Sequence, residues 1–265
     1  MHEADFGVEG ETAIVTGASQ GIGESIAKTL AAGGANVAIC SREMDRVGPV
    51  ADEINDSDAD GEALAVECNV REREEVEAFV EATVEKFGGL DICVNNAGGE
   101  FVAAFEDISP NGFESILDLN VMGTVHCMQV AGEAMREDGG GKIVNMASVN
   151  GQHAAPNESH YSTAKAGIIR LTETVATEWA DDGIRVNCVA PGLIQTPGVA
   201  ETLGISSDAM PPRETVDRRI GYGEDIADVV QFLVSPAAAF MTGETVTVKG
   251  VPRPGNSMQH DLGLE

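Results

Sequence analysis

Short apolar runs alternate with longer amphipathic runs along nearly the whole chain, and this alternation constrains the fold more than any other feature. Such strict alternation requires a parallel sheet with helices on both faces, joined by right-handed crossovers. The expected strands are 12–16, 36–40, 63–67, 91–94, 142–146, 184–189 and 244–248. The expected helices are 22–32, 43–55, 72–87, 110–135, 159–180 and 224–234. The prediction is an α/β, doubly wound fold with about seven parallel strands.

Neither a linker nor an internal repeat interrupts this pattern, so we expect a single domain over residues 1–265. The segment from about 193 to 220 is irregular and rich in Pro, Gly and Ser, and it is expected to form a lid over the substrate pocket. The tail from about 250 to 265 contains Pro252 and Pro254 and is expected to be non-regular.

The charge balance is strongly acidic. Sixteen Lys and Arg residues stand against 44 Asp and Glu residues, which gives a formal net charge of −28. A charge of this size causes self-repulsion, which salt screens. We therefore expect a salt-adapted, halophilic protein that works in a high-salt cytoplasm. The same acidic surface argues against nucleic acid or an anionic membrane as a partner.

The five cysteines are scattered without CxxC spacing, which predicts reduced, buried thiols rather than disulfides. Neither the cysteines nor the five histidines have the spacing of metal ligands, so no metal site is expected. The acidic N-terminus lacks the apolar core of a signal peptide, and no apolar run is long enough to span a membrane. The expected location is the cytoplasm.

A glycine-rich turn, Gly17–Gly23, lies between the first expected strand and the first expected helix. Glycines allow a sharp turn and the close approach of a pyrophosphate, which the free N–H groups and the dipole of the following helix attract. A simple tight turn is the alternative. The position directly after a buried strand favours a dinucleotide site.

Residues Thr16–Gly23 (TGASQGIG) resemble the TGxxxGxG fingerprint of the short-chain dehydrogenases/reductases. Asn95–Gly98 (NNAG) is similar to that family's motif after the fourth strand, and Pro191–Gly192 with Thr196 is similar to its nicotinamide-side loop. The resemblance covers nearly the whole chain and implies a Rossmann fold, a nicotinamide cofactor, a small-molecule substrate and a homo-oligomer, either a tetramer or a dimer. The cofactor-binding residues expected on these grounds are Gly17, Ser19, Gln20, Gly21, Ile22, Gly23, Ser41, Arg42, Asn69, Val70, Asn96, Ala97, Gly98, Tyr161, Lys165, Pro191, Gly192, Ile194 and Thr196.

Asn120, Ser148, Tyr161 and Lys165 fall at the catalytic spacings of the same family. A YxxxK pair alone is most simply an exposed helix face, but Ser148 and the glycine-rich turn favour catalysis. The resemblance implies that Tyr161 is the general acid of the reduction and that Ser148 binds the substrate oxygen. It further implies that Lys165 lowers the pKa of Tyr161 and binds the nicotinamide ribose. Asn120 is expected to hold a water near Lys165, with a hydrogen bond to the helix backbone as the alternative.

The second expected strand leads into Ser41 and Arg42, where NAD-preferring relatives usually carry an acid. A guanidinium suits a 2′-phosphate, with the Ser41 hydroxyl as a second donor, so NADP(H) is favoured over NAD(H). The alternative is that Arg42 is only a surface residue. Gln20 weakens the case, because NADP-binding relatives often have a cation there. Asn69 and Val70 replace the family's Asp-Val, and the Asn69 carbonyl can still accept from an adenine amino group.

The substrate is the least constrained part of the prediction. We favour a ketone of the 3-oxoacyl thioester type. A sugar or small-alcohol dehydrogenase is the first alternative, and an enoyl or dienoyl thioester reductase is the second, because 95–105 and 178–192 are similar to that branch. A non-catalytic dinucleotide-binding sensor is the alternative from another class. Gln152 and His153, on the loop after Ser148, are further candidates for lining the pocket.

Overall fold

The computed structural model describes residues 4–203, 210–218 and 220–251. In these residues a seven-stranded sheet has the order β3-β2-β1-β4-β5-β6-β7, and all strand pairs are parallel. The strands are β1 (Thr12–Thr16), β2 (Asn36–Ser41), β3 (Ala63–Glu67), β4 (Ile92–Asn95), β5 (Gly141–Met146), β6 (Ile184–Pro191) and β7 (Thr245–Val248). The predicted doubly wound Rossmann fold is confirmed.

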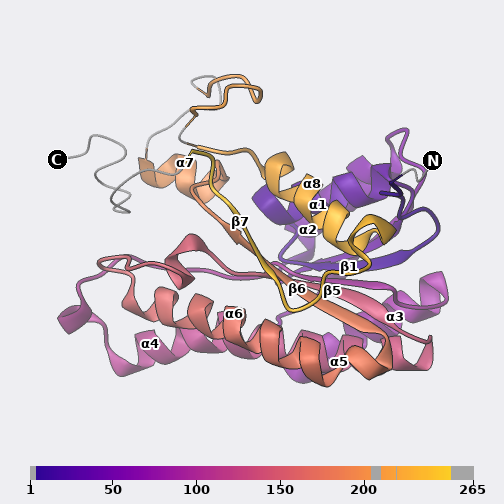
Figure 1. Ribbon diagram of the computed structural model, residues 1–265, viewed down its shortest axis with the longest axis horizontal. Helices are drawn as coiled ribbons and strands as arrows, with labels where there is room; N and C mark the ends of the chain where they lie inside the picture. The colour runs from indigo at the N-terminus through magenta and orange to yellow at the C-terminus, as the bar shows by residue number, and fades with distance from the viewer. Residues whose placement is uncertain (1–3, 204–209, 219, 252–265) are drawn as a thin grey trace.

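Helices cover both faces of the sheet (Figure 1). They are α1 (Gly21–Ala32), α2 (Met44–Asn55), α3 (Arg73–Phe87), α4 (Pro110–Leu117), α5 (Gly123–Glu137), α6 (Ser159–Glu178), α7 (Pro197–Leu203) and α8 (Gly223–Val234). Helices α1, α2 and α8 share one apolar cluster with the sheet, and α3 and α5 share another. None of the helices in the described ranges is long and apolar enough to cross a membrane.

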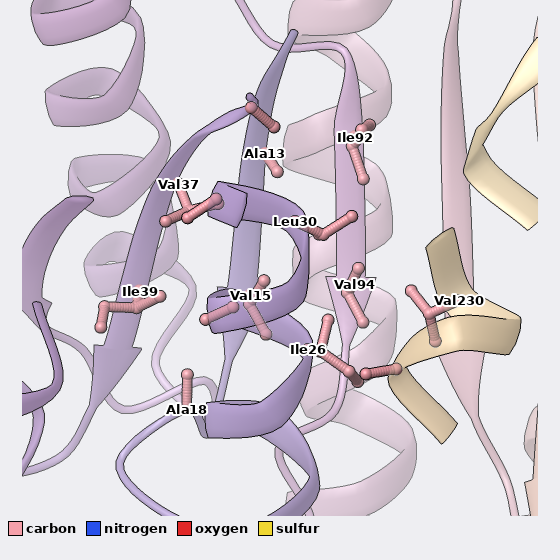
Figure 2. Packing of buried hydrophobic residues seen from close by; sticks show 14 of the residues in the cluster. Ala13, Val15, Ala18, Ile26, Leu30, Val37, Ile39, Ile92, Val94 and Val230 are labelled. Atoms are coloured by element: carbon pink, nitrogen blue, oxygen red, sulfur yellow. The ribbon is translucent and has the colours of Figure 1, made fainter. Parts of the chain in front are cut away.

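Successive side chains of β1 point to opposite faces of the sheet, so this one strand contributes residues to both apolar clusters. Ala13 and Val15 pack toward α1, whereas Ile14 between them packs toward the opposite face. Figure 2 shows Ile26 and Leu30 of α1 lying over β1 and β4. Both residues are fully buried. This packing holds the first turn of α1 at the carboxyl end of β1, where the strand order reverses and α/β proteins bind their ligands.

The predicted helix from 110 to 135 is interrupted in the structure. A π-helical turn over Asp118–Met122 separates α4 from α5. The widened turn lets the Asn120 side chain donate from Nδ2 to the carbonyl oxygen of Ile116 at 2.9 Å. Interruptions of this type often mark functional positions, and this one carries a residue that the family spacing had singled out.

The lid region is partly helical rather than wholly irregular, because it contains α7. Positions 204–209 and 219 of the expected lid, and 252–265 of the expected tail, lie outside the described residues. All five cysteines are buried and free. Among the described residues, no group of three or more His, Cys, Asp or Glu side chains is arranged to hold a metal ion.

Candidate active site

The glycine-rich turn is held open by close packing around its backbone. Gly17 has a φ of 65°, and a Cβ atom there would lie 2.8 Å from Cα of Ala97. A Cβ atom on Gly23 would lie 2.4 Å from Nδ2 of Asn96. That amide donates to the carbonyl oxygens of Thr16 and Gly17, at 3.0 Å each. Asn96 and Ala97, which directly follow β4, therefore hold the turn in place, and only glycine fits at positions 17 and 23.

Two adjoining cavities follow the carboxyl edge of the sheet, with volumes of about 320 Å³ and 280 Å³. They share Ile22, Asn96, Gly98 and Thr196 and so form one cleft. The remaining predicted cofactor residues of the first cavity are Gly17, Ser19, Gln20, Gly21, Ser41, Arg42, Asn69, Val70 and Ala97. Those of the second are Tyr161, Lys165, Pro191, Gly192 and Ile194. Gly23 lines neither cavity and lies in the first turn of α1. An elongated cleft of this kind fits a dinucleotide.

Ser148, Tyr161 and Lys165 meet in the second cavity. The Nζ atom of Lys165 lies 5.4 Å from the centre of the Tyr161 ring and donates to the carbonyl oxygen of Met146 at 2.9 Å. The Ser148 hydroxyl accepts from the backbone N–H of Asn150 at 3.1 Å. That bond uses a lone pair and leaves the hydroxyl proton available to a substrate oxygen.

Asn120 lies behind this group and lines neither cavity. Its Nδ2 donates to the carbonyl oxygens of Ile116 and Gly99, while its Oδ1 is buried without a hydrogen-bond partner. A Cβ atom on Gly98 would lie 2.7 Å from this Oδ1 and 3.3 Å from Nζ of Lys165. The Asn120 amide nitrogen therefore makes the hydrogen bond to the helix backbone that was the alternative. The Asn120 oxygen lies near Lys165 and is free to accept a hydrogen bond from a water, as the first expectation requires.

A buried chain of hydrogen bonds ties α6, which carries Tyr161, to the sheet. Asn95 Nδ2 donates to Asn145 Oδ1 at 2.8 Å, and Asn145 Nδ2 donates to Thr172 Oγ1 at 2.9 Å. All three side chains are at least 97% buried. Because unsatisfied polar groups are costly in an apolar interior, this chain specifies how α6 sits on β4 and β5.

Burial shifts the titration of the catalytic groups. Removal of the phenol from water, and then the nearby Glu100 carboxylate, raise the pKa of Tyr161, which a hydrogen bond with Ser148 partly counteracts. The expected lowering of the Tyr161 pKa is therefore not found in the protein alone. Burial also lowers the pKa of Lys165 to about 8. A protonated tyrosine is the form that a general acid for reduction requires.

The far end of the first cavity has two arginines. Arg42 is exposed, and no hydrogen bond or ion pair of its side chain is found within the described residues. Arg46, which the sequence interpretation missed, lies in the first turn of α2 and donates to Oε1 of Gln20 at 3.1 Å. The Ser41 hydroxyl donates to the backbone oxygen of Glu43 at 2.9 Å, so its proton is used locally. Arg46 also pairs with Glu43 at 3.8 Å, but a guanidinium has five N–H donors, so Arg46 keeps donors that face the cavity. Its spacing of four from Arg42 was the signal for it.

The loop after Ser148 turns away from the cleft beyond Asn150. Gln152 exchanges two hydrogen bonds with the Thr247 side chain of β7, at 3.0 and 3.1 Å. Neither Gln152 nor His153 is among the residues that line the second cavity. Asn150 lines it instead, together with Glu100, which the sequence interpretation also missed.

Comparison with known proteins agrees with this geometry. A family model described as enoyl-(acyl carrier protein) reductase matches residues 17–250. A short-chain type dehydrogenase/reductase from Mycobacterium marinum superimposes with a TM-score of 0.81 at 35% identity, covering 92% of this chain and 95% of that one. This chain belongs to the short-chain dehydrogenase/reductase family.

Two further members of the family bear on its chemistry. A 3-oxoacyl-[acyl-carrier-protein] reductase of Synechocystis sp. is 38% identical over 246 residues, 91% of this chain and 96% of that protein. A 7α-hydroxysteroid dehydrogenase, solved with NADH and 7-oxo glycochenodeoxycholic acid, has a TM-score of 0.84 at 32% identity and covers 94% of this chain and 98% of its own. The short-chain dehydrogenase/reductase described here is an NAD(P)-dependent oxidoreductase acting on a ketone or an alcohol.

Proposed function

We propose that this enzyme reduces the ketone of a 3-oxoacyl thioester to the 3-hydroxyacyl thioester, with NADPH as the reductant. The observation that carries the proposal is the 38% identity with the Synechocystis 3-oxoacyl reductase, which extends over nearly the full length of both chains. The apolar side chains of Leu193, Ile194 and Val199 at the lid side of the second cavity suit an acyl chain.

In the proposed reaction each polar residue in or beside the second cavity has a separate role. The nicotinamide, when bound, supplies the hydride. Ser148 donates its hydroxyl proton in a hydrogen bond to the ketone oxygen, which gains negative charge during the reaction. Tyr161 donates its phenolic proton to that oxygen. Lys165 stabilises the resulting phenolate, and the free Oδ1 of Asn120 holds a water through which Tyr161 and Lys165 regain a proton.

The test is a comparison of ketone and alkene substrates at molar salt. We expect acetoacetyl-CoA to be reduced to 3-hydroxybutyryl-CoA with a kcat/KM at least about a hundredfold above that for cyclohexanone or a 7-oxo bile acid, because remote contacts contribute to the transition state. Reduction of crotonyl-CoA instead would identify the enoyl thioester alternative. A preference for the bile acid would favour the second candidate, a secondary-alcohol dehydrogenase like the hydroxysteroid enzyme.

The proposed preference for NADP(H) rests on Arg42 and Arg46 at the end of the first cavity. Arg42→Ala should weaken NADPH binding by about 1–3 kcal/mol, the range of a charge-assisted hydrogen bond, and leave NADH binding unchanged. Titration of both cofactors by isothermal calorimetry at molar salt measures this. Arg73→Ala on α3, which removes an arginine outside the cleft, is the matched control. Equal losses for NADPH and NADH would mean that Arg42 does not recognise the 2′-phosphate.

The proposal also includes a cytoplasmic location in a high-salt cell and a homo-oligomer built through α4, α5 and α6. The charge of −28 supports the first. Exposed apolar side chains near these helices, Phe105 at 71% and Met122 at 41% exposure, support the second. Light scattering at molar salt would give the subunit count.

A further inference from the structure

The substrate end of the cleft carries an acidic side chain that the reduction described above does not use. Glu100 lines the second cavity together with Ser148 and Tyr161. Its charge reaches the reacting group, because the Glu100 carboxylate raises the pKa of Tyr161. A charge this close to the phenol also acts on any charge that a substrate brings to the ketone.

The loop that carries Glu100 is held in place on both sides of it. Before it, the carbonyl oxygen of Gly99 accepts from Nδ2 of Asn120 at 2.9 Å. After it, the Phe101 ring packs on the ring of His160 in α6, with 4.1 Å between the ring centres. These contacts on both sides fix the backbone from which the Glu100 side chain enters the cavity.

A second acid faces Glu100 from the start of α6. The backbone N–H of Ala103 donates to the carbonyl oxygen of Asn157 at 3.0 Å and brings the loop against Glu158. Glu158 is 8% exposed, and its Oε2 accepts from Nδ2 of Asn150 at 2.6 Å. Removal from water, and then the Glu158 charge, raise the pKa of Glu100 to about 7. Two neighbouring carboxylates repel each other, so Glu100 keeps its proton to a higher pH than an isolated glutamate would.

We propose that Glu100, held against Glu158, is a specificity-determining residue that excludes free 3-oxo acids and admits neutral 3-oxo esters and thioesters. This inference rests on the proposed 3-oxoacyl substrate. The two substrate classes share the ketone and differ at the neighbouring carboxyl carbon, which is an anion in the acid and neutral in the thioester. A carboxylate at that position would lie in the same small cavity as the Glu100 carboxylate, where charges interact more strongly than in bulk water.

The charges around Glu100 define how the selection varies with pH. Within the described residues, the ionisable groups facing it are Glu158, Tyr161 and Lys165, all on or beside α6. Asn150 and the lid side chains of the cavity add no charge. Below pH 7 a protonated Glu100 leaves one anion and one cation, Glu158 and Lys165, in the pocket. Above pH 7 a second anion appears, so an anionic substrate is rejected more strongly.

The experiment compares ethyl acetoacetate with acetoacetate, which stays an anion throughout, between pH 6 and 8 at molar salt. The measured quantity is the ratio of the two kcat/KM values, in which the proton supplied by Tyr161 cancels because both ketones need it. Loss of the Lys165 charge near pH 8 does not cancel, because that charge acts on the anionic substrate alone. In the wild type we expect the preference for the ester to rise about tenfold from pH 6 to 8. In Glu100→Gln the rise should shrink to about twofold, because only the titration of Lys165 remains. In Glu158→Gln the rise should move to lower pH, because the charge that raises the Glu100 pKa is gone.

Glu106→Gln, which neutralises an exposed acid on the neighbouring turn outside the cavity, is the matched control and should behave as the wild type. A rise in Glu100→Gln as large as that of the wild type overturns the proposal. If neither ketone is reduced, the 3-oxoacyl function fails. In that event ¹³C NMR of protein labelled at the glutamate carboxyl carbon still decides the role of Glu100. The proposal is supported if one signal titrates near pH 7 and is absent from the spectrum of Glu100→Gln. Addition of acetoacetate should shift this signal below pH 7 and should leave it unchanged above pH 7. The absence of such a signal overturns it.

Discussion

Tyr161→Phe is expected to lower kcat/KM for the reduction of acetoacetyl-CoA by about a thousandfold, the range of a lost general acid. The substitution removes one oxygen and keeps the ring. The centre of this ring lies 5.4 Å from Nζ of Lys165. Thermal stability should change little. NADPH affinity should fall by no more than about tenfold, because only one hydroxyl contact is lost.

The control for this prediction is Tyr222→Phe. The chain has two tyrosines, and the hydroxyl of Tyr222 donates to the carbonyl oxygen of Pro211 at 2.7 Å, outside both cavities. Steady-state rates at saturating NADPH should be near those of the wild type for Tyr222→Phe. If Tyr161→Phe kept more than about a tenth of the wild-type kcat/KM, another group would be the proton donor, and the assignment of Tyr161 would be wrong.

The positions of the strands and of the motifs were accessible from the sequence because local patterns determine them. An apolar run as short as 12–16 is typical of a buried strand, and its alternation with longer amphipathic runs requires a parallel sheet covered by helices. Residues with a characteristic spacing, such as Tyr161 and Lys165 on α6, were located for the same reason.

The parts that were missed depend on contacts between distant segments. Glu100 and Glu158 are 58 residues apart, and only the packing of the 99–103 loop on α6 brings them together. The π-helical turn at Asn120 was missed for the same reason, because the Asn120 side chain also donates to the carbonyl oxygen of Gly99, 21 residues earlier in the chain. The pKa of Tyr161 was expected to fall because Lys165 was considered without the burial and the Glu100 charge that oppose it.

Lys165→Met should have opposite effects on activity and on stability. Activity should fall by about a hundredfold to a thousandfold, because the phenolate of Tyr161 loses the ammonium that stabilises it. The folded protein should become more stable at pH 7. Lys165 is 4% exposed, and burial lowers its pKa from 10.5 to about 8, which corresponds to about 3 kcal/mol of destabilisation. Loss of the hydrogen bond to the Met146 carbonyl oxygen offsets about 1 kcal/mol of the gain.

The dependence of this stability gain on pH gives it a clear signature. Between pH 10.5 and 8 the unfolded chain binds a proton at Lys165 that the folded chain does not, so wild-type stability falls as the pH falls through this window. The gain from Lys165→Met should be complete below pH 8 and should vanish near pH 10.5. Thermal unfolding at pH 7 should show a rise of about 5 °C in Tm, and the same measurement near pH 10.5 should show none.

Lys86→Met is the matched control for the loss of a lysine. Lys86 is 43% exposed and pairs with Glu62 on the surface, where ion pairs contribute little, so its replacement should leave Tm nearly unchanged. A fall in Tm for Lys165→Met at pH 7 would mean that the buried ammonium is well solvated by its neighbours. A rise, together with the loss of activity, would show that the enzyme keeps a destabilising charge in its interior because Tyr161 requires it.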